Sequence, residues 1–391
     1  MNEQWVSFAN EIKKMYGKYF VPLHEPTFND TEIEYVTDCV KSGWVSSVGK
    51  YVDRFERELA EFTGVKRAVA VVNGTAALQI AMKIAGVKPN DEVFMPALTF
   101  IATANAASYL QAIPHFVDVS EETLGLDPMK LEEYIKEIGV MKNGNLVNKK
   151  TDRIIRAVVP MHTFGHPVDL DPLVELCLRY NLALVEDAAE SLGSYYKGKH
   201  TGGFGVAAAL SFNGNKIMTT GGGGAILTND ERLADYAKHI TTTAKVPHQW
   251  EYVHDEIGYN YRMPNLNAAL GCAQLTKIEG FLASKRALAI RYEKLVEQID
   301  GTRLFMEPTF ATSNYWLQTV ILDSEVHRRD DVLALLNDAG AMARPIWTPL
   351  NELSEYKICP KDELTVTEKL KETIINIPSN PLKGHAFYDK T

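Results

Sequence analysis

One carboxylate and one lysine stand out in this 391-residue chain as groups suited to do chemistry together. Asp187 ends an apolar run that starts at residue 183, and Lys216 follows a second apolar run over 207–212. Both runs resemble buried strands, so we expect the acid and the lysine at the ends of two strands. A lysine amine can bind an aldehyde covalently, and a buried carboxylate can pair with a ring cation. The two residues therefore suit a heterocyclic aldehyde cofactor.

Pyridoxal 5′-phosphate meets this description, and we expect it as the cofactor. Lys216 would be its covalent attachment point and the catalytic proton carrier, while Asp187 would keep the pyridine nitrogen protonated. A lysine chosen at random is usually a solvated surface residue, but Lys216 lies between a β-rich run and the glycines of 221–224. Those glycines do not form a Walker loop, because the lysine precedes them. We expect them to let the backbone turn sharply and pass close to the cofactor.

A strand, a short turn and a helix start are predicted before residue 85. The apolar stretch 67–72 leads into Asn73-Gly74-Thr75, and a helical run follows over 76–85. Free N–H groups at a helix N-terminus favour an anion, so this turn can cradle a phosphate. In isolation, glycine and threonine more often serve as an ordinary turn and cap. Only the combination with Asp187 and Lys216 favours the phosphate interpretation.

Together these motifs resemble the DegT/DnrJ-type sugar-nucleotide aminotransferases, a branch of the fold-type I pyridoxal phosphate enzymes. Glu186-Asp187-Ala188-Ala189 is similar to the family's E-D-A-A strand end. Ser211-Phe212 with Lys216 matches S-F-x-x-x-K, and 219–224 matches T-T-G-x-G-G. The resemblance covers nearly the whole chain. It implies an α/β aminotransferase with a large doubly wound, mostly parallel seven-stranded sheet domain and a smaller α+β C-terminal domain.

The resemblance also implies roles that spacing alone leaves open. The G-T turn would hold the cofactor phosphate, and Phe100, in the segment T-F-I-A-T, would stack on the ring, although a lone phenylalanine is usually a core residue. Glu190 is a candidate for the ring hydroxyl, at a position that varies within the family, and Ser211 is a candidate for the phosphate. Asn260, in a G-Y-N segment, would reach the phosphate in the neighbouring subunit of a homodimer with shared active sites.

The implied reaction moves an amino group from L-glutamate to C4 of a nucleotide-linked 4-keto-6-deoxy sugar, for bacterial surface glycan biosynthesis. The loop 43–50 is either a connector with one packed tryptophan or a recognition loop near the sugar. It is most similar to that of enzymes making UDP-linked 4-amino sugars of the bacillosamine or legionaminic acid type, which implies a UDP-4-keto-6-deoxy-N-acetylglucosamine-like substrate. A GDP-perosamine-type synthase is the alternative. The nucleotide, the sugar epimer and the residues that bind the sugar and the donor carboxylate stay open.

Two other functional classes use this fold. A sugar dehydratase carries histidine in place of the cofactor lysine, and Lys216 speaks against it. A non-catalytic sugar-binding protein would be favoured if the purified chain took up no pyridoxal phosphate. The absorbance of the bound cofactor and the mass of the product distinguish these classes from an aminotransferase.

The length of the chain favours two domains. Strands alternate with helices from residue 67 to 240, which predicts a doubly wound layer that binds ligands beyond the carboxyl ends of its strands. We expect a large cofactor-binding domain over 1–255 and a small α+β domain over 256–391, with an N-terminal helix able to pack on the small domain. Between 139 and 152 an Asn-Gly turn predicts a surface hairpin.

Composition excludes several partners. Hydrophobic residues make up 46% of the chain and the net charge is −9, with no basic block, so we expect neither nucleic-acid nor membrane binding. No uncharged apolar run is long enough to span a bilayer. The four cysteines form no C-x-x-C pair, which suits a reducing cytoplasm and suggests neither a zinc site nor a disulfide framework. His162 and His166 lack ligand-spaced partners, so we favour structural or pocket-lining roles over a metal site.

Overall fold

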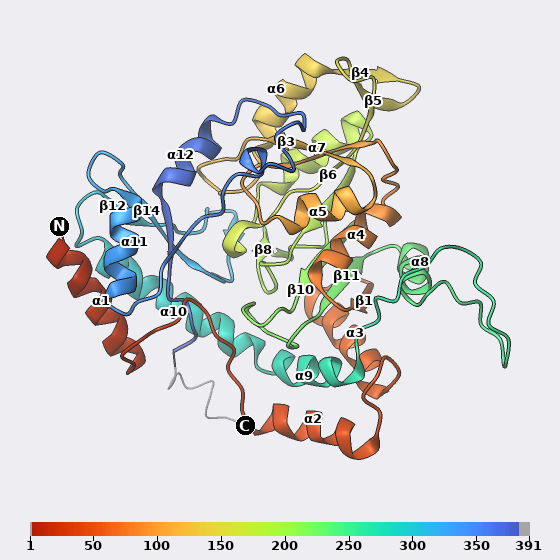
Figure 1. Ribbon diagram of the computed structural model, residues 1–391, viewed down its shortest axis with the longest axis horizontal. Coiled ribbons are helices and arrows are strands. Elements are labelled where there is room, and N and C mark those ends of the chain that lie inside the picture. Colours follow the sequence, from red (N-terminus) through yellow and green to blue (C-terminus); the bar gives the residue numbers. More distant parts are fainter. Residues whose placement is uncertain (1, 383–391) are drawn as a thin grey trace.

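A mostly parallel sheet lies at the centre of the molecule (Figure 1), in a computed structural model that describes residues 2–382. Its main path runs β1-β11-β10-β7-β6-β2-β3. Strand β11 is antiparallel to both of its neighbours, and the other pairs along the path are parallel. The bounds are β1 Arg67–Val71, β2 Glu92–Pro96, β3 Ile113–Val117, β6 Ile154–Val158, β7 Ala183–Asp187, β10 Ala207–Ser211 and β11 Gly224–Thr228. The expected seven-stranded layer is confirmed.

Helices cover both faces of this sheet, so its strands are buried on both sides and read as nearly continuous apolar runs. One face packs against α4 (Gly74–Ile84), α5 (Ala102–Tyr109) and α8 (Glu231–Thr241). On the other face lie α6 (Pro128–Ile138), α7 (Leu170–Tyr180), α3 (Lys50–Thr63) and α9 (Asn265–Leu275). Alternate residues of β1 enter the two layers, with Val69 and Val71 on one side and Ala68 and Ala70 on the other. The arrangement is doubly wound, as predicted.

The predicted hairpin is present as β4 (Gly139–Lys142) and β5 (Asn145–Asn148). Asn143 and Gly144 both have positive φ, 50° and 77°, which suits the tight turn of a two-residue hairpin. Strand β5 also pairs with β6, which brings the sheet to nine strands. The hairpin is therefore an extension of the sheet as well as a surface feature.

A second sheet contains β12 (Thr302–Leu304), β14 (Gln318–Leu322), β16 (Ile374–Ile377) and β15 (Arg344–Pro345). Helices α10 (Ile278–Val296) and α11 (Arg329–Asp338) contribute to its core, as does α1 (Asn2–Tyr16) through Trp5, Phe8 and Ile12. Figure 1 shows α1 beside α11, far from the first strand of the chain. The N-terminal helix thus packs on elements from the C-terminal third of the sequence.

Smaller elements connect the two sheets. Strands β8 (Tyr195–Tyr196) and β9 (Lys199–His200) follow Asp187 and pair with each other, and β8 also pairs with β13 (Ala311–Thr312) from the C-terminal part. The remaining helices are α2 (Asp30–Ser42), α12 (Thr365–Thr373) and two 3₁₀ turns at Thr163–Gly165 and Leu350–Glu352. Within residues 2–382, no helix combines the length and apolarity needed to cross a bilayer. All four cysteines are free.

Candidate active site

The cofactor-site residues predicted from the sequence, except Asn260, come together around one cavity of about 260 Å³. These residues are Gly74, Thr75, Phe100, Asp187, Glu190, Ser211 and Lys216. Each follows or ends one of the parallel strands β1, β2, β7 and β10, so the cavity lies at their carboxyl ends, where ligands of doubly wound sheets bind. Sequence analysis did not identify the rest of the wall, which includes Asn213, Asn215, Trp316 and Trp347.

Asp187 is a buried carboxylate whose hydrogen-bond donors are all neutral. Thr103 Oγ1 donates to its Oδ2 at 2.7 Å, and the backbone N–H of Ala189 donates to its Oδ1 at 3.2 Å. Burial raises the pKa of Asp187, although these donors and Lys216 act against the shift. A cationic ring atom in the cavity would favour the ionised form, so the site fits a protonated pyridine nitrogen. The position of Thr103 in the T-F-I-A-T segment was the available signal for its role.

Glu186, the preceding residue, points to the opposite side of β7 because successive strand residues alternate between faces. Its carboxylate accepts hydrogen bonds from the backbone N–H groups of Gly202, Phe204 and Gly205 at 2.7–2.9 Å and pairs with His162 at 3.2 Å. Burial alone would raise its pKa, but His162 and the N–H groups outweigh burial and lower it. Glu186 therefore has a structural role, outside the cavity.

Neither predicted histidine lines the cavity. His162 is the partner of Glu186, and His166 is buried edge-on against Phe305 and Tyr315, with ring centroids 4.6 and 5.3 Å away. Both contacts agree with structural roles. Among residues 2–382, the one cluster with metal-ligand geometry is the partly exposed group His239, Asp255 and Glu256. It does not border the cavity.

The phosphate turn depends on close backbone packing. Asn73 caps α4 by accepting a hydrogen bond from the N–H of Ala76 at 2.8 Å, so the start of this helix opens on the cavity. A Cβ at Gly74 would lie 2.8 Å from the Cβ of Ser211, and a Cβ at Gly224 would lie 2.5 Å from the carbonyl of Asn73. The glycines thus allow the turn, β10 and β11 to meet, and Gly74 and Thr75 at the start of α4 line the cavity, where a helix N-terminus favours an anion.

Lys216 lies between a carboxylate and an aromatic ring. Its Nζ is 3.0 Å from Glu190 Oε1 and 3.9 Å from the centroid of Trp316, and 12% of its side chain is exposed. Glu190 is buried, and its Oε2 accepts a hydrogen bond from the N–H of Phe164 at 2.9 Å. Burial raises the pKa of Glu190 to about 7 even though Lys216 acts against the shift. The predicted lysine therefore has a close acidic partner inside the cavity.

Phe100 and Asn260 occupy more open positions. Phe100 lines the cavity with 49% of its surface exposed, and its ring centroid is 6.4 Å from that of Trp347. Stacking of Phe100 on the cofactor stays a prediction. Figure 1 shows the segment between α8 and α9 extending from the body of the protein. Asn260 is exposed where this segment returns to the body, its backbone pairs with that of Thr242, and its Oδ1 accepts hydrogen bonds from Arg262. Asn260 does not line the cavity of its own chain.

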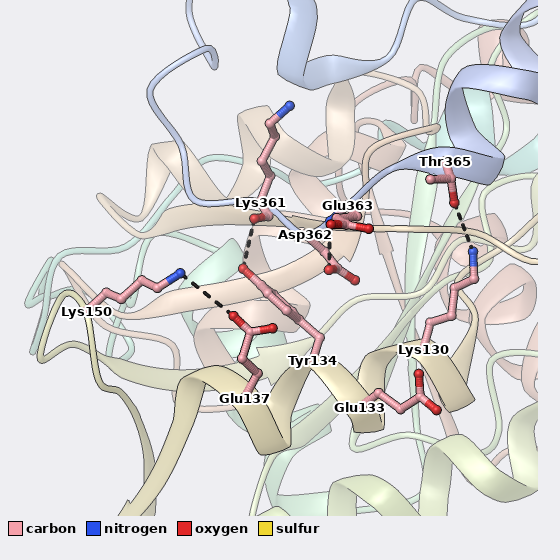
Figure 2. Close-up of a pocket in the computed structure, with 9 residues that line it drawn as sticks. All are labelled: Lys130, Glu133, Tyr134, Glu137, Lys150, Lys361, Asp362, Glu363 and Thr365. Atoms are coloured by element: carbon pink, nitrogen blue, oxygen red, sulfur yellow. Dashed lines mark hydrogen bonds and ion pairs between the residues drawn. The ribbon is translucent and has the colours of Figure 1, made fainter.

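A larger cleft, of about 570 Å³, lies beside α6 (Figure 2). Several of its polar side chains bond to one another or to neighbouring backbone. Lys150 pairs with Glu137 at 4.0 Å, and Lys130 donates to Thr365 at 3.5 Å. The cleft contains none of the residues that the sequence analysis assigned to chemistry. Size alone therefore does not identify the active site.

Known proteins are similar to this chain in sequence and in fold. Residues 26–386 match the DegT/DnrJ/EryC1/StrS aminotransferase family. The chain is 38% identical over 339 residues to EpsN of Bacillus subtilis (strain 168), whose name describes a pyridoxal phosphate-dependent aminotransferase, covering 87% of this chain and 83% of EpsN. It is 36% identical over 373 residues to the GDP-perosamine synthase of Caulobacter vibrioides, covering 95% and 96%. The aminotransferase TlmJ from Streptoalloteichus hindustanus has the same fold, with a TM-score of 0.83 and 29% identity over 92% of this chain and 93% of TlmJ.

Proposed function

This chain belongs to the DegT/DnrJ/EryC1/StrS aminotransferase family, and from that premise we propose that it transfers the amino group of L-glutamate to C4 of a nucleotide-linked 4-keto-6-deoxy sugar. It is a pyridoxal phosphate-dependent aminotransferase, and a relative named as a spore coat polysaccharide biosynthesis protein, SpsC of Bacillus subtilis (strain 168), supports a role in polysaccharide biosynthesis. The observation that carries the proposal is the convergence of Asp187, Lys216 and the start of α4 on one cavity.

The residues of the cavity have separable roles in this proposal. Pyridoxal phosphate, when bound, withdraws electrons from the carbon that carries the amino group and so acidifies its proton. Lys216 Nζ holds the cofactor covalently and, once released, moves the proton at that carbon. The buried carboxylate of Asp187 keeps the ring nitrogen protonated. The N–H groups of Gly74 and Thr75, with the hydroxyl of Ser211, bind the phosphate.

UDP and GDP are the two candidates for the nucleotide that carries the sugar. The resemblance of loop 43–50 favours UDP and a sugar of the 4-keto-6-deoxy-N-acetylglucosamine type. Identity of 36% over 95% of the chain to a GDP-perosamine synthase favours GDP as the second candidate. Purified enzyme should be incubated with L-glutamate and UDP-, GDP- or dTDP-linked 4-keto sugars, and the product mass should increase by the change from ketone to amine with one nucleotide class.

A homodimer with shared active sites is part of the proposal. Asn260 lies outside the cavity of its own chain, on a segment that exposes Trp250, Tyr252 and Ile257. Exposed apolar side chains gathered on one segment are typical of an interface. In the proposed dimer this segment packs on a second copy and Asn260 reaches the phosphate there. We also keep the expectation of a cytoplasmic enzyme, which the four free cysteines support.

Reductive trapping tests the role of Lys216. Borohydride treatment of the enzyme with pyridoxal phosphate, followed by peptide mapping, should place the cofactor on Lys216, and Lys216→Arg should abolish the label. Lys197→Ala is the matched control, because Lys197 also has a carboxylate partner, Asp171, and an aromatic neighbour but lies outside the cavity. It should trap like the wild type. A label on another lysine, or none, would refute the assignment.

A further inference from the structure

We infer that Trp316 is a positioning residue for Lys216. The indole ring of Trp316 holds the ammonium group of Lys216 whenever that amine is not bonded to the cofactor. The inference rests on the proposed role of Lys216. It adds a second residue to the site, Trp316, which lies just before β14 and 100 positions after Lys216 in the sequence. Trp316 lines the same cavity as Lys216 and is 5% exposed. Sequence analysis gave no signal for this contact.

The contact has the geometry of a cation–π interaction. Lys216 Nζ lies 3.9 Å from the centroid of the Trp316 ring, well inside the range of about 6 Å over which an ammonium is attracted to an indole face. Glu190 Oε1 lies 3.0 Å from the same nitrogen. The amine is thus held by a carboxylate and a ring face, in a site where little water competes. The carboxylate attracts an ammonium by its charge, and the indole by its electron-rich face.

Trp316 is fixed by hydrogen bonds on the indole and on both sides of its backbone. Its Nε1 donates to the carbonyl of Asn215 at 2.7 Å, which ties the ring to the residue before Lys216. Its backbone N–H donates to Asn314 Oδ1 at 2.8 Å. Its carbonyl accepts from Lys285 Nζ at 2.9 Å. The ring therefore has one orientation with respect to the lysine.

Lys285 is an unusual anchor for this segment. Its side chain is fully buried, and its Nζ donates to the carbonyls of Tyr315, Trp316 and Ser379, at 3.5, 2.9 and 2.6 Å. A buried amine is costly unless its N–H groups are bonded, so this arrangement strongly favours one backbone position for 315–316. No catalytic role of the proposed mechanism uses Lys285.

The same segment also fixes the second partner of Lys216. Asn314 Nδ2 donates to the carbonyls of Glu190 and Leu192 at 2.8 and 2.9 Å. Residues 314–316 thus hold the turn that carries Glu190 and, through Trp316, the segment that carries Lys216. The segment 314–316, from the C-terminal part of the chain, therefore positions both Lys216 and the carboxylate of Glu190.

A graded weakening of the ring face tests the inference. Trp316 is replaced site-specifically by tryptophans carrying one, two or four ring fluorines. The fluorines withdraw electron density from the indole face, while the shape of the ring and its N–H group are nearly unchanged. The readout is the rate at which an amine-selective acylating reagent labels Lys216, measured by peptide mass in the full-length enzyme with pyridoxamine 5′-phosphate bound. Exposed lysines of the same molecule are the internal reference. This readout needs no turnover.

We expect labelling of Lys216 to rise with each step of fluorination, by between about twofold and tenfold over the series, because a weaker ring face holds the amine less firmly and leaves it more accessible to the reagent. The same substitutions at Trp347 are the matched control. Trp347 lines the same cavity, and its described ring contacts are with Phe100 and Phe164. There the rate should stay constant.

Two outcomes would overturn the inference. If the labelling rate of Lys216 does not change with fluorination at position 316, the ring does not hold the amine. An equal rise at both positions would show a general opening of the cavity instead. Borohydride mapping of the cofactor is done on the same proteins, so a failure of the assignment of Lys216 itself is recognised separately, by a label elsewhere in the chain.

Discussion

Glu186 and Asp187 have the same chemistry and adjacent positions, yet they serve different purposes. The pleat of β7 turns Glu186 toward three backbone N–H groups and His162, and turns Asp187 toward the cavity. The pKa of Glu186 is lowered by partners that outweigh its burial, whereas burial raises the pKa of Asp187. Opposite consequences of mutation follow for the two residues.

Asp187→Asn should reduce turnover by about 100-fold or more, the order of loss seen when a fixed charge partner of a reacting group is removed. The apoprotein should be as stable as the wild type or more so at neutral pH, because burial disfavours the charge of Asp187. Glu186→Gln should keep the absorbance of bound cofactor but lower the free energy of unfolding by about 1–3 kcal/mol. Steady-state kinetics and thermal unfolding separate the two. Near-normal turnover in Asp187→Asn would show that the ring nitrogen has another partner.

Glu190 gives the apoprotein a pH dependence near neutrality. Its folded pKa is raised to about 7 from an ordinary 4.5. The folded state therefore binds more protons than the unfolded state between these values, and stability falls as the pH rises through this window. Glu190→Gln has no such titration, so its melting temperature relative to wild type should increase from pH 5 to pH 8. Parallel curves for the two proteins, with all other titrating groups shared, would contradict the shift.

The loop 43–50 is attached to the first residue of α9. Asn265 is buried, its Oδ1 accepts a hydrogen bond from the N–H of Tyr51 at 3.0 Å, and its Nδ2 donates to the carbonyl of Trp44 at 2.6 Å. A Cβ at Gly49 would lie 2.4 Å from the Asn265 side chain. The loop that the family resemblance places near the sugar is thus attached to the start of α9, through the Asn265 side chain and through the backbone N–H of Asn265, which donates to the carbonyl of Ser46 at 2.6 Å.

Asn265→Ala should loosen this loop by removing its side-chain attachments to Trp44 and Tyr51, and should raise the KM for the nucleotide sugar about tenfold, because a displaced recognition group loses the binding that depends on orientation. The absorbance of bound cofactor should not change, since Asn265 does not line the cofactor cavity. Trp44→Ala, which removes a largely exposed side chain but leaves the loop attached, is the comparison. A changed cofactor spectrum with an unchanged KM would argue against a sugar-recognition role for the loop.

The two sheets and their connections form one catalytic unit. The proposed cofactor lysine and acid, Lys216 and Asp187, follow or end strands of the large sheet, while Trp316 and Trp347 close the cavity from the C-terminal part of the chain. We propose a division into 1–255 and 256–391, of which residues 383–391 lie outside the described part. Helix α9, early in the second unit, packs on α2 and α3 of the first. The proposed units therefore share a core as well as an active site.

Subunit mixing tests the proposed dimer. Lys216→Ala and Asn260→Ala homodimers should each bind the cofactor poorly. A hybrid of the two has one site with an intact Lys216 and, if Asn260 acts across the interface, an intact Asn260 from the other subunit. Verified hybrids should then recover up to half of the wild-type cofactor sites. If Asn260 acts within its own chain, no site in the hybrid is complete and no recovery appears.

The residue types and their positions at the ends of apolar runs were enough to predict the chemical groups and their shared location. Buried strands with polar residues at their carboxyl ends leave little choice, because parallel strands of one sheet bring those ends to one edge. Asp187, Lys216 and the Gly74-Thr75 turn could therefore be predicted to meet, and they line the same cavity. The confirmed hairpin at 139–148 follows from equally local rules, since an Asn-Gly pair suits the positive φ angles of its turn.

The side chains that surround those groups could not be predicted from local patterns, because long-range packing brings them there. Thr103 reaches Asp187 across 84 positions of sequence, and Trp316 reaches the residue beside Lys216 across 101. Such contacts depend on how helices pack on the sheet and how the second sheet packs against the first. That packing results from many small contributions of buried surface, which leave no local pattern in the sequence. The partner of the lysine and the anchoring of Trp316 by Lys285 therefore emerge from packing, whereas the lysine itself is recognised from its own segment.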